Sequence, residues 1–448
     1  MSRRSASPLP EAREAKRRKI ASSLTPEDYK NGVVLAPMVR SSALPTRLMS
    51  LKYGAKLVWG PEIVDRAILH AKRVVNPDTG TISYMGQQSK AMFTCHPLEK
   101  PYFIFQIGSA NPDLAVQAAK VVMEDVAGVE LNCGCPKPFS TSGGMGAALL
   151  STPDLLCSIL SALRRELPEH ISVSAKIRLL STQEETKALV ARILDTGVNC
   201  LTIHCRTRSM RKTEPARIER MREIVEYIRS LGKDVAVLQN GDCVGYEDAR
   251  KLRTITGADS CMIATAAESN PSVFSPTPLA DLEQTLIPSY LRLSKYLDNH
   301  WASTKFSVQQ FKGTHKVTTK ASSRQVREAI IKAKKYEDVE SIVGLWSGEE
   351  ELRAIERVIL ERERNGPPLC MPLPVEELSP AEQALVAPPP HKETTNASVA
   401  STPPTETLLD EDDASSTSTS TAVGTEPNTA KDGVALESGL GVLLPAVK

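Results

Sequence analysis

The chain has 448 residues, a formal net charge of +2 and a mean hydropathy of −0.21. It contains no apolar run of about eighteen residues and its N-terminus is charged, so we expect no membrane span and no export signal. Nine cysteines without regular spacing are typical of reduced intracellular thiols. The length allows one large domain and a smaller one.

Charge is unevenly divided along the chain. Residues 366–448 carry 12 acidic and 3 basic residues, a charge of −9, which leaves +11 on the rest. This asymmetry favours an anionic partner for the basic part, although an acidic tail can also serve solubility alone.

The first segment, residues 1–28, is expected to be a disordered basic arm. Arg3-Arg4 and the cluster from Lys16 to Lys19 resemble a two-part nuclear-import signal or an RNA-binding arm. Short basic runs also occur by chance in exposed tails. The expected location is therefore the cytoplasm, the nucleus or both.

Residues 29–280 alternate between β-rich segments and amphipathic helical stretches. This pattern predicts a parallel sheet, and eight units over about 240 residues favour a (β/α)8 TIM barrel. A doubly wound sheet is the alternative, but the GxGxxG turn typical of it is missing. The predicted strands are Val33–Met38, Leu57–Ile63, Tyr102–Gly108, Gly128–Gly134, Ser172–Arg178, Asn199–Cys205, Val235–Gly241 and Asp259–Ala264.

Polar or unusual residues end seven of these segments. In a barrel all such ends meet on one face, where active sites lie. These residues are Pro37-Met38, Glu62, Gln106, Asn132 with Cys135, Lys176 with Arg178, His204 with Arg206, and Asn240-Gly241.

Beyond the barrel, residues 281–365 have helical spacing and predict a small α-helical domain. Its basic residues are interleaved with aromatic residues and a histidine, a pattern that suits a nucleic-acid backbone but also an ordinary solvated helix face. The basic residues are Lys305, Lys312, Lys316, Lys320, Arg324, Arg327, Lys332, Lys334 and Lys335, and the others are Trp301, Phe306, Phe311 and His315. Residues 366–448 are rich in Pro, Ser and Thr and are expected to be disordered.

Cys135 is the most informative residue, because it lies in a Gly-Cys-Pro turn at a strand end, before a glycine-rich loop. A nucleophile, a metal ligand, an inert thiol and a proton donor are the possible roles. Cys133-x-Cys135 is not a usual zinc spacing and no partner motif lies nearby, so no metal site is expected. An ordinary thiol is protonated at neutral pH, which suits a general acid.

Several runs at the strand ends resemble the tRNA-dihydrouridine synthases, most closely the eukaryotic type that acts on position 20 of the D loop. The resemblance covers residues 32–274 and continues more weakly to about 343. The runs are Leu35–Arg40, Glu62–Asp65, Phe105–Gly108, Asn132–Pro136, Ser140–Gly146, Lys176–Arg178, Ile203–Arg206 and Gln239–Gly241.

The resemblance implies an FMN enzyme that reduces the C5=C6 bond of a uracil in tRNA and uses NADPH, with Cys135 protonating C5. It places Lys176 beside the N1/O2 edge of the flavin, with Gln106 bonded to the ring and Pro37 and Met38 packed against it. It further implies that His204 lies against the cofactor. The substrate residues that it implies around the uracil and its phosphates are Asn132, Arg178 and Arg206.

By the same resemblance, the FMN phosphate is expected at the turns after the seventh and eighth strands, which contain Asn240, Gly241 and Asp242, and Ala264 and Thr265. Two residues depart from the family pattern. Asp242 replaces a glycine, and Thr265 replaces an arginine, which removes a charge-assisted contact. We therefore expect weaker FMN retention than in relatives.

The expected partner is tRNA, bound by a monomer without metal or membrane. The basic stretch from His204 to Arg222 begins at the active face and can hold RNA backbone while a base enters the pocket. Two alternatives remain, a flavin barrel that reduces a small molecule and a flavin-less RNA-binding barrel.

Overall fold

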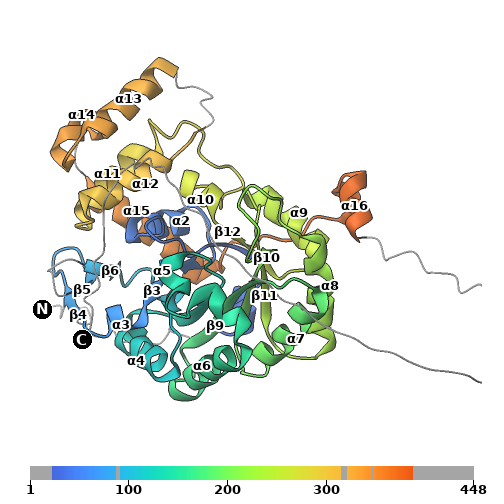
Figure 1. Ribbon diagram of the computed structural model, residues 1–448. Helices are drawn as coiled ribbons and strands as arrows, with labels where there is room; N and C mark the ends of the chain where they lie inside the picture. Colours follow the sequence, from blue (N-terminus) through green and yellow to red (C-terminus); the bar gives the residue numbers. More distant parts are fainter. Residues whose placement is uncertain (1–22, 87–90, 314–319, 345–346, 387–448) are drawn as a thin grey trace, which may run out of the picture. The chain divides into compact units, whose positions relative to one another are not determined.

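The structure, a computed structural model, describes residues 23–86, 91–313, 320–344 and 347–386. Its centre is a closed barrel of parallel strands, which confirms the predicted fold (Figure 1). The strand order is β2-β1-β12-β11-β10-β9-β8-β7, and pairing of β2 with β7 closes the ring. The strands are β1 (Gly32–Leu35), β2 (Val58–Trp59), β7 (Phe103–Gly108), β8 (Gly128–Cys133), β9 (Ser172–Leu179), β10 (Cys200–Thr207), β11 (Ala236–Asn240) and β12 (Ser260–Ile263).

The second predicted strand differs from the structure. Pro61 has no N–H for a strand ladder, and the segment Leu57–Ile63 is divided into β2 and a separate β3 (Ile63–Val64), which also pairs with β7. A small antiparallel sheet that the sequence did not reveal follows β3. It consists of β4 (Lys72–Val75), β5 (Ile82–Met85) and β6 (Ala91–Cys95).

Helices follow the barrel strands, and the longer ones cover the outer face of the barrel (Figure 1). They are α2 (Leu44–Lys52), α3 (Asp65–Ile68), α4 (Pro112–Val122), α5 (Pro138–Thr141), α6 (Pro153–Glu166), α7 (Gln183–Leu194), α8 (Glu219–Ser230), α9 (Tyr246–Thr256) and α10 (Thr265–Ser269). Short 3-10 turns are η2 (Pro26–Tyr29), η3 (Lys100–Tyr102), η4 (Met123–Asp125) and η5 (Gly146–Ser151).

The core has two parts because strand side chains alternate between two faces. Leu131, Ile177 and Ile203 belong to the large cluster between strands and helices. Trp59 and Met262 belong to a separate cluster that fills the barrel interior. The two clusters leave the carboxyl ends of the strands to polar residues.

Tyr29 is buried against the opposite ends of the strands. Its hydroxyl lies 2.7 Å from Oγ of Ser172, and its carbonyl accepts a hydrogen bond of 2.6 Å from Oγ of Ser260. The segment from Leu24, which is also buried, to Asp28 therefore packs on the barrel, although composition assigned it to the basic arm.

The helices predicted after the barrel are present in the described chain. Helix α15 packs on α2 of the barrel and on α11. The elements are α11 (Leu286–Tyr296), α12 (Trp301–Gln310), α13 (Lys320–Lys332), η6 (Tyr336–Val339), α14 (Glu340–Val343) and α15 (Gly348–Asn365).

Residues 366–386, which composition assigned to the disordered tail, pack on the barrel instead. We call residues 366–378 the strap. The backbone N–H of Cys370 donates to the carbonyl of Asn31 at 2.9 Å, and Arg253 donates to both the Cys370 carbonyl and Oδ1 of Asn31. Leu373 and Leu378 pack with Ile255 of α9. The last elements are η7 (Val375–Glu377) and α16 (Pro380–Val386).

The expectations for residues 1–22 and 387–448 lie outside the described residues. Within the described ranges, no helix is both long and apolar enough to span a bilayer. The same residues contain no group of three His, Cys, Asp or Glu side chains arranged to hold a metal ion.

Candidate active site

The strand register brings the predicted polar residues to one end of the barrel. Asn132 of β8 lies opposite Lys176 of β9, and Arg178 of β9 lies opposite His204 of β10. His204 in turn lies opposite Asn240 of β11. Residues paired in parallel register share a level in the barrel, so the structure brings these side chains together at one end.

Below them lies a buried carboxylate that the sequence analysis did not single out. Nε2 of Gln106 donates to Oε1 of Glu130 at 2.7 Å, and Glu130 is fully buried. Burial raises the pKa of Glu130, while the nearby Lys176 ammonium opposes the shift. Gln106 thus has a protein partner for its amide N–H, and Glu130 places negative charge beneath Lys176. The sequence feature that could have revealed Glu130 is a charged residue between Val129 and Leu131 in an otherwise apolar strand.

Lys176 is the cation at the centre of this face. Within the described chain its Nζ forms no hydrogen bond and no close ion pair. Burial lowers the pKa of Lys176, and attraction to Glu130 opposes the change. Removing an ammonium from water without a hydrogen-bond partner costs free energy, unless an anionic or polar ligand accepts hydrogen bonds from it.

His204 is held neutral. Burial and the cations Lys176, Arg178 and Arg206 lower its pKa to about 2. Nη1 of Arg206 lies 3.3 Å from its Nε2. Because a guanidinium can only donate, Nε2 must accept, and the proton of the neutral ring lies on Nδ1. His204 therefore offers one N–H donor to a ligand.

The turn that carries Cys135 is organised by Asn132. Oδ1 of Asn132 accepts the backbone N–H groups of Gly134 and Cys135 at 3.0 and 3.1 Å. Asn132 thus positions the cysteine, a role distinct from the direct substrate contact implied by the resemblance. Cys135 itself is partly exposed. Burial is the main cause that raises the pKa of its thiol, so the sulfur stays protonated near neutral pH.

Like Asn132, the two arginines that the resemblance implies at the substrate also make hydrogen bonds within the protein. Nε of Arg178 donates to the Gly134 carbonyl at 2.7 Å, and its Nη1 donates to the Thr207 carbonyl at 3.1 Å. Arg178 remains half-buried, beside Cys135. Arg206 is buried, and its Nε donates to the Glu214 carbonyl at 2.7 Å. Arg206 therefore supports the loop after β10.

The turn after β11 is closed by internal bonds. Nδ2 of Asn240 donates to the Met262 carbonyl at 2.9 Å, and Oδ2 of Asp242 accepts the N–H of Ala216 at 2.6 Å. Gly241 has a φ of +119°, and a Cβ there would lie 3.0 Å from Cβ of Ala216. The glycine is needed because the loop after β10 lies directly against it.

The last turn, after β12, is more open. Thr265 is exposed at the start of α10, and Ala264 before it is partly exposed. Pro37 and Met38, at the end of β1, are also partly exposed, and Oγ of Ser42 fixes the Met38 backbone at 3.0 Å. These residues therefore retain exposed surface that a ligand could contact.

Only part of the predicted basic stretch is free to meet a partner. Arg220 donates to carbonyls of Leu180 and Thr182, and Arg222 donates to those of Thr254 and Ile255, so both join helices. The exposed basic residues of this loop are Arg208, Arg211, Lys212 and Arg217.

The helical domain is similarly divided. Nζ of Lys305 donates to the carbonyls of Ile331 and Ala333, and Arg327 pairs with Glu283 at 2.8 Å. Phe311 is buried, and Phe306 lies under the guanidinium of Arg40 at 3.9 Å, at the barrel mouth. His315 and Lys316 lie outside the described residues. Exposed basic residues among the described part of the domain are Lys312, Arg324, Lys332, Lys334, Lys335, Arg353, Arg357 and Arg364.

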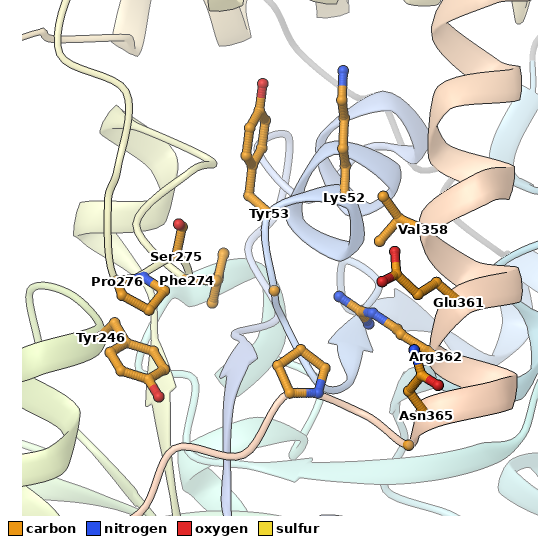
Figure 2. A pocket seen from close by; sticks show the side chains of 13 residues that line it. Lys52, Tyr53, Tyr246, Phe274, Ser275, Pro276, Val358, Glu361, Arg362 and Asn365 are labelled. Atoms are coloured by element: carbon orange, nitrogen blue, oxygen red, sulfur yellow. The ribbon is translucent and has the colours of Figure 1, made fainter.

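A cavity of about 410 Å³ lies away from these strand ends, beside α2 and α15 (Figure 2). Its lining includes Tyr53, Tyr246, Phe274 and Arg362. Arg362 donates to the carbonyls of Leu51 and, at 2.8 Å, Ala55, and so caps the end of α2. None of the predicted site residues lines this cavity.

Residues 34–358 match the family model described as dihydrouridine synthase (Dus). The chain belongs to the dihydrouridine synthase family. The matched part includes the whole converging set from Gln106 to Thr265 and ends within α15. The strap lies beyond the match.

Relatives within the family are similar over most of the described chain. One is the tRNA-dihydrouridine(20) synthase (NAD(P)+) of Schizosaccharomyces pombe, 47% identical over 319 residues, which cover 70% of this chain but 64% of that protein. Another is the protein of the same name from Saccharomyces cerevisiae, 39% identical over 298 residues, 63% of this chain and 77% of that one. The chain thus spans just under two thirds of the S. pombe relative.

Proposed function

We propose that the protein is an FMN-dependent tRNA-dihydrouridine synthase that reduces the C5=C6 bond of uridine 20 in the D loop with NADPH. The observation that carries this proposal is that a protonated thiol, Cys135, and an ammonium, Lys176, lie together at one end of a barrel of this family. Among the described residues, Lys176 has no hydrogen-bond partner. The printed names of the two relatives support tRNA, position 20 and NAD(P)+ for those proteins.

The residues present fit FMN. Lys176 lacks a hydrogen-bond partner within the described chain and can balance the negative charge of a reduced flavin. His204 can donate through Nδ1, and Thr265 and the backbone beside it can meet a phosphate. Reduced FMN, when bound, supplies a hydride for C6 of the uracil.

Cys135 completes the reduction from the other side of the base. Its S–H bond breaks as a C5–H bond forms, and Cys135 is left as a thiolate. Burial keeps the thiol protonated before the transfer. Asn132 fixes the backbone of Cys135, and the guanidinium of Arg178 lies beside the sulfur, where it stabilises the thiolate that forms.

The exposed basic residues of the loop after β10 can hold tRNA backbone next to this face, because their charges are free of helix contacts. The helical domain adds a second basic surface, and Arg40 stacked on Phe306 links it to the barrel mouth. RNA binding by both surfaces is part of the proposal.

The test is to purify the protein, look for flavin absorbance near about 370 and 450 nm, and incubate it with NADPH and unmodified tRNA. Dihydrouridine mapped at position 20 supports the proposal. Reduction of free uridine at a comparable rate would instead favour a small-molecule reductase. Tight tRNA binding without flavin or reduction would favour a flavin-less RNA-binding barrel.

A further inference from the structure

A second ionisable group, Glu62, lies against the Cys135 loop. It follows β2 and is 8% exposed. Oγ of Ser140 donates to its Oε1 at 2.8 Å. A Cβ on Gly146 would clash with both this Oγ and the carbonyl of Cys135, so the carboxylate lies against the loop that carries the cysteine. Oε2 accepts no close hydrogen bond within the described residues. The carboxyl group and the thiol are therefore close enough for each to shift the pKa of the other.

The surrounding backbone is shaped to hold this carboxyl. A Cβ on Gly108 would lie 2.6 Å from Oε1 of Glu62, so any larger residue would displace it. Gly146 has a φ of +57°, and a Cβ there would lie 2.6 Å from the Cys135 carbonyl. The N–H of Ala147 donates to that same carbonyl at 2.9 Å. Two glycines thus let the loop close over Glu62 and Cys135 together.

We propose that Glu62 returns a proton to Cys135 after each transfer to the uracil. This inference rests on the proposed function. When the S–H proton moves to C5, a thiolate remains beside Glu62. The O–H bond of the Glu62 carboxyl then breaks as the S–H bond re-forms, and the carboxylate takes its next proton from water. Each proton that Cys135 gives to C5 is thus replaced by one proton from water, passed on through Glu62. The transfer of hydride to C6 is not affected.

The electrostatics suit this role. Burial raises the pKa of Glu62, while hydrogen bonds from Ser140, Cys135 and Asn132 oppose the rise. Burial is also the main cause that raises the pKa of Cys135, and the negative charge of Glu62 adds to it, whereas Arg178 opposes. Thiol and carboxyl therefore each hold their proton more strongly while the other is ionised. A thiolate next to Glu62 is accordingly short-lived.

The first test measures the thiol directly, without turnover. The protein as purified is alkylated with iodoacetamide across a pH range, and modification of Cys135 is followed by peptide mass spectrometry. In the wild type the midpoint should lie above about 8.5, the ordinary thiol value. At the alkaline pH of this midpoint the Glu62 carboxyl has lost its proton, so Glu62→Gln removes a neighbouring negative charge and the midpoint should fall by roughly one pH unit. An unshifted midpoint in the variant, or a wild-type midpoint below the ordinary value, overturns the inference.

The second test separates proton return from proton donation. Glu62→Gln should form the first dihydrouridine per active site at about the wild-type rate, and steady-state turnover should fall by about 10²-fold or more. Small acids such as imidazole or acetate should restore turnover. Wild-type steady-state rates in the variant, or a loss that no added acid restores, would contradict the proposal.

The matched control is Glu268→Gln, since Glu268 also accepts a serine hydroxyl hydrogen bond, from Ser41 at 2.5 Å, but does not adjoin Cys135. It should leave the alkylation midpoint and turnover unchanged. If the wild type forms no dihydrouridine, the proposed function fails, whereas the alkylation midpoints still report whether Glu62 controls the proton of Cys135.

Discussion

Nη2 of Arg206 lies 2.5 Å from Oδ1 of Asp242, and this ion pair joins the end of β10 to the turn after β11. A carboxylate at position 242 seemed unfavourable beside a phosphate. Its charge is in fact balanced by Arg206, and its other oxygen accepts the N–H of Ala216. Asp242 therefore fixes the base of the basic loop.

Asp242→Asn should loosen that loop. Asn tolerates the positive φ of 59° at this position. It has one acceptor oxygen and no charge, so it cannot bond both Arg206 and the N–H of Ala216. Because half of the Asp242 side chain is exposed, we expect a modest effect, with trypsin cleaving after Arg208, Arg211 or Lys212 about two- to five-fold faster. Asp234→Asn, an exposed carboxylate after α8, is the control. Equal cleavage rates in the two variants would show that Asp242 does not hold the loop after β10 in place.

Cys135→Ala should keep tRNA and FMN binding and lose about 10²- to 10⁴-fold in dihydrouridine formation, the usual contribution of a general acid. The loss should be equally large in a single turnover, since the chemical step itself lacks its proton. Binding is measured by filter retention and flavin absorbance, and product by mapping position 20. Product formation at the normal rate would show that another group protonates C5.

Lys176→Met should weaken FMN retention by about tenfold or more, because a charge-assisted contact contributes roughly 1.5–3 kcal/mol. The measurement is flavin released on dilution, followed by fluorescence. The control is Lys120→Met on α4, where the lysine pairs with Glu166 at 3.6 Å far from the strand ends. Unchanged flavin affinity would remove Lys176 from the cofactor site.

Thr265→Arg should tighten FMN binding by about tenfold, since an arginine can pair with a phosphate where the threonine hydroxyl cannot supply charge. Ser230→Arg, at the far end of α8, adds the same charge elsewhere. If the wild type already keeps one flavin per chain through purification and Thr265→Arg binds no more tightly, the expected weak retention is wrong.

Arg362→Met should destabilise the protein by about 1–3 kcal/mol, because two carbonyls at the end of α2 lose a cationic donor. Burial lowers the pKa of Arg362 to about 10, which shows that burying its charge is itself unfavourable. Arg362→Met removes this unfavourable contribution and so offsets part of the lost hydrogen bonding. Urea unfolding measures the change. Arg364→Met, an exposed position on the same helix, should have little effect, and equal stability of the two variants would refute the capping role.

Much of the barrel could be predicted because its signals are local. Each parallel strand is a short apolar run followed by a helix, and strand ends such as Lys176 and His204 interrupt that run with polar residues. The sheet β4–β6 was missed because Lys72–Val75 is exposed along its whole length and shows no alternation. The strap was missed because its order comes from distant partners, Asn31 and α9, and not from its own composition.

The site was predicted less completely than the fold. The residue types and their positions in the sequence were enough to place Cys135 and Lys176 at strand ends. They did not reveal which groups the two side chains contact. Arg206 was expected at the uracil, yet the loop that it supports is formed by residues 208–216, whose conformation no local pattern reveals. Glu62 was noticed as a polar strand end and as part of a run shared with the family. Its place beside the Cys135 loop depends on Gly108 at the end of β7 and Gly146 at the start of η5.

The contact between Cys370 and Asn31 has a consequence for synthesis of the chain. The groove formed by Asn31 and α9 stays uncovered on the ribosome until residues beyond 370 have emerged, long after β12 has closed the barrel. Nascent barrels therefore expose Ile255 and the Arg253 guanidinium to the cell, and a fragment ended at residue 280 or 365 would do so permanently. The barrel of this protein is consequently a poor unit for expression by itself.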